Sequence, residues 1–79
     1  MNHEEELNFA ELFGEFVRQG RMEQKIKQQD LADHLGMSQA YLSRLEQGAR
    51  NIDLELAVKI CSFLKLDLNE FIKASRNLE

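Results

Sequence analysis

The stretch QQDLADHLGMSQAYLSRLEQG, residues 28–48, decides the fold of this chain. Its first part predicts a short helix, since the apolar residues there fall on one helical face: Leu31, Ala32 and Leu35. Gly36 ends this helix, because glycine accepts the left-handed backbone that a helix C-terminus often needs. Ser38 can then cap a second helix that starts at Gln39 and stops at Gly48.

Two short helices joined by about three residues, with a glycine in the turn, cross at a steep angle, which is helix-turn-helix geometry. Leu42 and Leu45 mark the buried side of the second helix. The opposite side carries amide, small and guanidinium groups: Gln39, Ala40, Ser43 and Arg44. Groups of this kind read base edges in a DNA major groove. The stretch therefore predicts a helix that binds double-stranded DNA.

The length of 79 residues indicates a single domain, residues 1–79. We expect a cytoplasmic protein with no membrane partner, because the chain has no long apolar stretch and begins with an acidic segment instead of a signal peptide. The single Cys61 cannot form an internal disulfide, and a small core residue is the simplest interpretation of it. His3, His34 and Cys61 lack metal-ligand spacing, so we expect no metal, and nothing indicates a cofactor or a small-molecule ligand.

The net charge of −4 is unusual for a DNA-binding protein, but its distribution is uneven. The first fifteen residues carry −5, residues 16–50 carry +2 and residues 51–79 carry −1. The positive part coincides with the helix pair, as expected when one face meets phosphate. A modest basic patch is also common on proteins that bind no DNA, so charge alone decides little.

The N-terminal part predicts one long helix. Residues 1–7 are an acidic, frayed end, and Asn8 can cap a helix from Phe9 to about Gln24. Its apolar stripe consists of Phe9, Leu12, Phe13, Phe16 and Val17. Gly20 weakens this helix, and we expect another backbone to approach there.

Two more helices follow residue 48. Asp53 is an acidic N-cap for a helix running to about Leu64, and Asp67 opens a last helix to about Ser75. The inner stripe of the former consists of Leu54, Ala57, Ile60, Cys61 and Leu64. The chain is therefore predicted to be all-α, with five helices.

The sequence resembles the Xre family of lambda-repressor-like and Cro-like regulators over roughly residues 12–72. The residues that carry the resemblance are Arg21, Gln28, Leu31, Ala32, Gly36, Ser38, Leu42, Glu46, Gly48, Arg50 and Asn51. The family implies a compact five-helix DNA-binding domain and a homodimer on pseudo-palindromic operator DNA, with a role in transcription regulation. The small size and the loop Arg50-Asn51-Ile52 also resemble the controller proteins of restriction-modification systems.

The resemblance implies roles on the DNA-facing side. Gln28 matches a glutamine that bonds a phosphate and braces Gln39, which matches the principal base reader and can pair bidentately with adenine. Ala40 departs from the polar residue often found there and can touch a thymine methyl. Ser43 and Arg44 match the next outward positions, and Arg44 suits either a guanine or a phosphate.

Further matching residues are predicted to contact the DNA backbone: Lys27, Tyr41, Arg50 and Asn51. Arg50 and Asn51 match a loop that meets phosphates. Lys27 stands where the family often has Ser or Thr, which weakens the cap but adds positive charge. Tyr41 can reach the DNA with its hydroxyl or can serve in packing.

Two structural features are also predicted. The resemblance implies an ion pair between Arg21 and Glu46; the alternative is that Glu46 is an exposed surface acid. The C-terminal part is rich in apolar residues, which predicts a homodimer interface built from Leu66, Leu68, Phe71 and Ile72. In the alternative, Phe71 and Ile72 fold back on the first helix of their own chain.

An enzyme is not expected, because no nucleophile, base and orienting group occur together and no phosphate-binding glycine loop is present. An antitoxin or another protein-interaction module with the same fold is an open alternative, since a fold does not determine a function.

Overall fold

The structure, a computed structural model, describes residues 9–49 and 52–76. This part of the chain forms five helices and no strand, which confirms the all-α prediction. The helices are α1 Phe9–Glu23, α2 Gln28–Leu35, α3 Gln39–Glu46, α4 Leu54–Leu64 and α5 Leu68–Arg76. The N-cap prediction for Asn8 and the frayed end at residues 1–7 lie outside the described residues.

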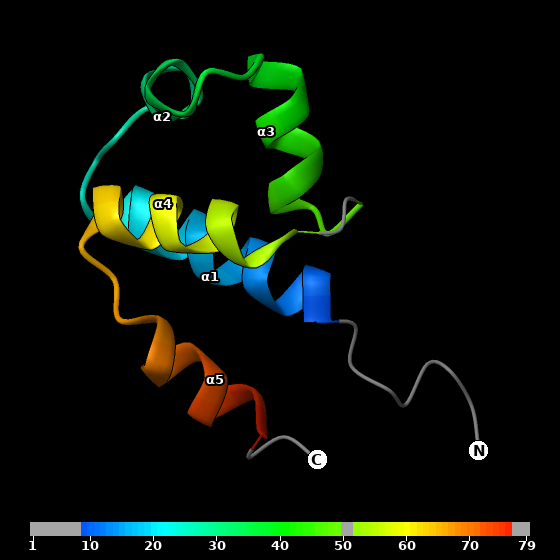
Figure 1. The fold of residues 1–79 in the computed structure, drawn as a ribbon. Helices are drawn as coiled ribbons and strands as arrows, with labels where there is room; N and C mark the ends of the chain where they lie inside the picture. Colours follow the sequence, from blue (N-terminus) through cyan, green and yellow to red (C-terminus); the bar gives the residue numbers. More distant parts are fainter. Residues whose placement is uncertain (1–8, 50–51, 77–79) are drawn as a thin grey trace.

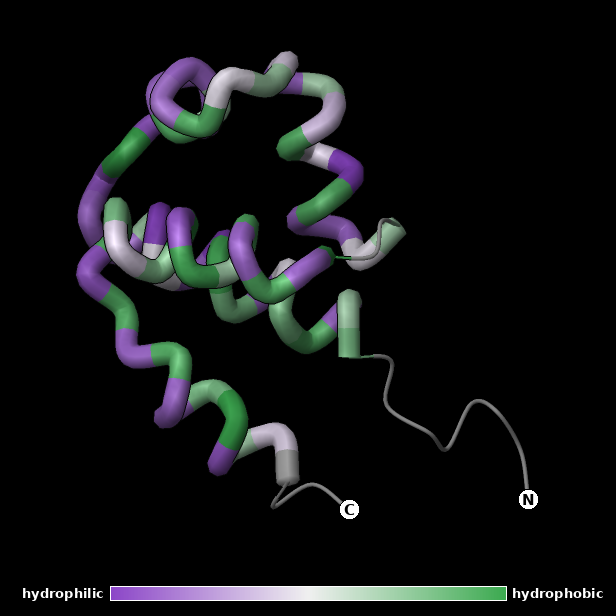
Figure 2. The backbone as a smooth tube through the Cα atoms, in the orientation of Figure 1, coloured by the Kyte–Doolittle hydropathy of each residue, from purple (hydrophilic) through white to green (hydrophobic). Residues whose placement is uncertain are grey.

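Helices α1 and α4 lie together in the middle of the fold, with α2 and α3 on one side and α5 on the other (Figure 1). Hydrophobic and hydrophilic segments alternate along the helices, so each helix can bury one side (Figure 2). The largest fully buried side chains come from α1, α2, α3 and α4: Phe13, Val17, Leu31, Leu42, Leu45, Ile60 and Leu64. One core therefore holds the helix pair α2–α3 against the rest of the molecule.

Three residues that were predicted to cap or end helices do so in the structure: Gly36, Ser38 and Asp53. Gly36 ends α2 in the left-handed region, at φ 73°. Ser38 caps α3, because its Oγ accepts a hydrogen bond from the Tyr41 backbone N–H at 3.0 Å. Asp53 caps α4 by accepting the Leu56 N–H at 2.8 Å. Helix α2 has no side-chain cap, since Lys27 stands at its N-cap position.

Two close approaches differ from the prediction. A Cβ atom at Gly20 would lie 2.6 Å from Leu66 Cδ1, so a side chain approaches there and not a backbone. The backbone approach is at Gly14, where a Cβ atom would lie 2.5 Å from the carbonyl oxygen of Glu46. Gly14 therefore lets α1 pack directly against the end of α3, which carries the candidate DNA-reading face.

Phe71 corrects the predicted dimer interface. Its ring is 5% exposed and packs on three phenylalanines of α1, with ring centroids 5.0–5.2 Å apart: Phe9, Phe13 and Phe16. The alternative in which Phe71 folds back on its own first helix is what the structure shows. Leu66 is likewise partly buried against Gly20. Both side chains pack within their own chain, because a small core needs the apolar area that Leu66 and Phe71 supply.

Candidate nucleic-acid interface

Helix α3 presents a polar face to the outside. It crosses α2 steeply, since α2 is viewed along its axis in Figure 1 while α3 runs across the view. Leu42 and Leu45 are fully buried, and the residues of the predicted reading face are exposed or half-buried: Gln39, Ala40, Ser43 and Arg44. Their contact with DNA stays a prediction, but these four side chains lie on one accessible face of a helix that is fixed to the core.

Gln39 is held by a second glutamine. Its Nε2 donates to Gln28 Oε1 at 3.1 Å, across the turn between α2 and α3. Gln28 stands at the first position of α2, so its side chain reaches α3 from the end of the neighbouring helix. A held side chain loses less conformational freedom on binding than a free one, so this bond prepares the Gln39 amide for contact.

Glu46 joins the glutamine pair to the core. Its carboxylate accepts Arg21 Nε at 2.8 Å and Arg21 Nη2 at 3.1 Å, and it also accepts Gln28 Nε2 at 3.1 Å. Arg21 Nη1 donates to the carbonyl oxygen of Ile26 at 2.9 Å. The structure thus contains the Arg21–Glu46 ion pair, and Glu46 is 6% exposed, so it is not the alternative surface acid.

The bond from Gln28 to Glu46 was not predicted. A glutamate so close to the polar face of α3 reads as a surface residue, because a sequence does not show how α1 approaches α3. One signal in the sequence could have indicated that Glu46 is buried. Gly14 is a small residue that lets α1 come close to α3, and Arg21 of α1 can then pair with Glu46 of α3.

The residues that were predicted to contact the DNA backbone differ in their exposure to solvent. Lys27 is exposed directly before α2. Tyr41 is half-buried and packs against the core, which bears out its packing role, whereas a contact through its hydroxyl stays a prediction. Arg50 and Asn51 lie outside the described residues.

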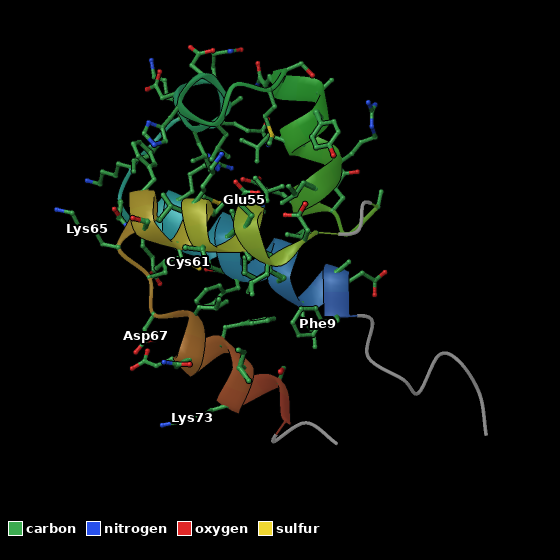
Figure 3. All side chains as sticks on the ribbon, in the orientation of Figure 1. Phe9, Glu55, Cys61, Lys65, Asp67 and Lys73 are labelled. Carbon is green, nitrogen blue, oxygen red and sulfur yellow. The ribbon has the colours of Figure 1, made fainter. Side chains whose placement is uncertain are left out.

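An apolar surface lies where the starts of α1 and α4 meet α5. A groove of about 200 Å³ is lined by residues of α1, α4 and α5, among them Phe9, Leu54, Leu68 and Ile72. Leu54 is 71% exposed, which corrects its predicted place in the inner stripe of α4. Phe9, Val58 and Ile72 are exposed as well, and the Phe9 ring lies at the start of α1 on the side that faces α5 (Figure 3).

Among residues 9–49 and 52–76, the remaining titratable groups form no second site. In the described part of the chain no three His, Cys, Asp or Glu residues are grouped to hold a metal ion. His34 stacks on Phe63, with ring centroids 4.0 Å apart. Burial, and to a lesser degree the charge of Asp67, raises the pKa of the Cys61 thiol. None of the helices within residues 9–49 and 52–76 combines the length and the apolar character that crossing a bilayer requires.

A steep pair of short helices with a polar outer face defines a helix-turn-helix domain. Comparison with protein families agrees: residues 17–71 match the model of the helix-turn-helix family HTH_3. The match covers more than half of the chain, which therefore belongs to this family of Xre-like regulators.

Two curated proteins are similar in sequence. One is an uncharacterised HTH-type transcriptional regulator, YqaE, of Bacillus subtilis (strain 168), which is 29% identical over 84% of this chain. The other is the ImmF control region 10 kDa protein of Bacillus phage phi105, which is 36% identical over 71% of this chain. The matched regions span 57% and 62% of these relatives.

Proposed function

We propose that this protein is a sequence-specific DNA-binding transcriptional regulator that binds a pseudo-palindromic operator as a homodimer. The observation that carries the proposal is the exposed face of α3, on which Gln39 is already oriented by Gln28. A glutamine amide that offers an oxygen and an N–H can pair bidentately with adenine in the major groove. The names of the two relatives, an HTH-type transcriptional regulator and a phage control region protein, favour the same role.

The remaining polar residues complete the proposed interface. Ala40 and Ser43 lie beside Gln39 on the face that meets the bases, and Arg44 reaches a guanine or a phosphate. Lys27 and Gln28 stand at the start of α2, where free backbone amides favour a phosphate. Arg50, Asn51 and the Tyr41 hydroxyl are proposed to contact the DNA backbone as well.

The proposed dimer uses the apolar groove. Ile72 and Leu68 remain from the predicted interface, and the exposed Phe9, Leu54 and Val58 extend it. Contiguous exposed apolar residues usually mark an interaction site, and a twofold contact between identical surfaces closes without further assembly. Such a dimer would place two recognition helices about one DNA turn, roughly 34 Å, apart. Joining two reading modules raises the effective affinity, which explains how a chain of net charge −4 could bind DNA.

Selection of bound duplexes from a random pool tests this proposal. We expect enrichment of one pseudo-palindrome whose half-sites are centred about 10 base pairs apart. Enrichment of no sequence, with weak and uniform binding, would contradict the proposal. The restriction-modification and antitoxin roles stay predictions, and neighbouring genes separate them: a restriction endonuclease gene points to a controller, a small toxin gene to an antitoxin.

A further inference from the structure

Glu46, Gln28 and Gln39 form a row of hydrogen bonds that runs from the core to the outer face of α3. Glu46 Oε1 accepts Gln28 Nε2 at 3.1 Å, and Gln28 Oε1 accepts Gln39 Nε2 at 3.1 Å. Glu46 is 6% exposed and is held in place by Arg21, whereas Gln39 is exposed. The fixed end of the row is therefore the carboxylate and the free end is the base reader.

The chemistry of the row determines how each amide is turned. An ionised carboxylate can only accept hydrogen bonds, so Gln28 must turn its NH₂ group to Glu46 and its oxygen to Gln39. The Gln28 oxygen can also only accept, so Gln39 must turn its NH₂ group to Gln28. This leaves Gln39 with one oxygen and one N–H for another partner.

We propose that Glu46 is a positioning residue for sequence specificity, because it sets the orientation of the Gln39 amide through Gln28. This inference rests on the proposed reading of DNA by α3. An oxygen beside an N–H matches adenine, which has a donor at N6 and an acceptor at N7. The opposite orientation would turn the Gln39 oxygen to Gln28 and present two N–H donors, which match the O6 and N7 acceptors of guanine. Glu46 thus selects adenine over guanine without touching DNA.

The substitution Glu46→Gln tests the inference. A glutamine at this position can turn either its oxygen or its NH₂ group to Gln28, so the row no longer imposes one orientation. Selection from a random pool should show wild-type protein preferring adenine at one position of each half-site by roughly tenfold or more. The variant should accept guanine there to within about threefold, while preference at the other positions persists.

A second variant addresses the loss of the ion pair in Glu46→Gln. Gln28→Ala breaks the row but leaves Arg21 and Glu46 bonded to each other, so it preserves the salt bridge that joins α1 to α3. It should weaken the adenine preference at the same position. Gln29→Ala is the matched control, because Gln29 is an exposed glutamine of α2 whose side chain bonds Asp33 and lies outside the row. This control should keep the wild-type preference.

Measurement on the free protein separates the row from DNA binding. NMR detection of the Gln39 side-chain NH₂ protons should show exchange with water that is several-fold faster in Glu46→Gln and Gln28→Ala than in wild type and Gln29→Ala. If the Gln39 NH₂ protons exchange at the wild-type rate in both variants, the row of hydrogen bonds does not hold Gln39 in the free protein. Retained adenine preference in both variants, with a wild-type protein that selects a site, would overturn the role of Glu46 in specificity. A wild-type protein that selects no sequence would instead refute the proposed function, and with it this role.

Discussion

The Glu46 carboxylate accepts two hydrogen bonds from the Arg21 guanidinium, at 2.8 Å and 3.1 Å, although the two residues are 25 positions apart in the sequence. The side chains of Arg21 and Glu46 are only 12% and 3% exposed, respectively. The pair therefore joins α1 to α3 in a place that water hardly reaches, and it fixes the end of the helix that carries the candidate reading face.

Removal of either partner should destabilise the fold strongly. We expect Arg21→Ala and Glu46→Ala each to lower the free energy of unfolding by about 3 kcal/mol, because the remaining charge is left unpaired in a poorly solvated place. The double variant should cost less than the sum of the two by at least about 1 kcal/mol. Urea denaturation followed by circular dichroism measures the cycle, and additive costs would contradict the pair.

The contact between α1 and α3 gives a second prediction. Gly14→Ala should lower the free energy of unfolding by about 1 to 3 kcal/mol or prevent folding, because the new methyl would meet the Glu46 carbonyl and the backbone cannot yield. Gly20→Ala is a matched control in the same helix, where the methyl meets the flexible end of the Leu66 side chain. It should cost clearly less, and equal losses of stability would show that the approach at Gly14 is not tight.

The ends of the helices could be predicted from the sequence, whereas the close approach at Gly14 could not. Helix ends at Gly36, Ser38 and Asp53 follow from local chemistry, because each residue bonds within its own helix or turn. The end of α4 was less obvious, since Lys65, at φ 58°, adopts the left-handed conformation usually taken by glycine. The neighbours of Gly14 depend on how distant helices pack, which no local pattern contains.

The same limit applies to the candidate site. The identity of the outward residues of α3 follows from helical periodicity, because Leu42 and Leu45 mark the buried side. The bond between Gln28 and Glu46 depends on the meeting of α1, α2 and α3. The direction of Phe71 likewise depends on α1, which offers three aromatic rings to it. An apolar stripe on α5 was therefore predictable, but the choice between a second copy of the chain and α1 as the partner of Phe71 was not.

Cys61 should be chemically protected in the folded state. Its thiol pKa is raised mainly by burial, so less of the reactive thiolate exists at pH 8 than in the unfolded chain. Alkylation by iodoacetamide at this pH should be clearly slower than in urea, because folding both lowers the thiolate fraction of Cys61 and buries its sulfur.

The same shift predicts the effect of pH on stability. Because the folded pKa exceeds the unfolded value of about 8.5, the contribution of the neutral thiol is complete below that pH and declines as the pH rises above it. In Cys61→Ala, the free energy of unfolding should lack this decline at high pH.

The alkylation test has a clear contrary result. If Cys61 is alkylated at the same rate with and without urea, its thiol is not buried.

The proposed homodimer should be broken by charge in the apolar groove. Leu54→Glu and Ile72→Glu change exposed side chains, so the monomer fold should survive, while a charge buried at the interface should cause dissociation. Lys73→Glu is a control on α5, because Lys73 points away from the other helices (Figure 3). Analytical ultracentrifugation at tens of micromolar protein gives the mass, and a wild-type monomer would contradict the dimer.

The affinity for a selected duplex relative to a scrambled duplex of equal length tests the central claim most directly. Fluorescence anisotropy at fixed salt should show wild-type protein binding the selected duplex at least about a thousandfold tighter. Gln39→Ala should lose about 1 to 3 kcal/mol on that duplex and nothing on the scrambled one, whereas Gln29→Ala should match wild type on both. Equal wild-type affinity for the two duplexes would contradict sequence reading by α3.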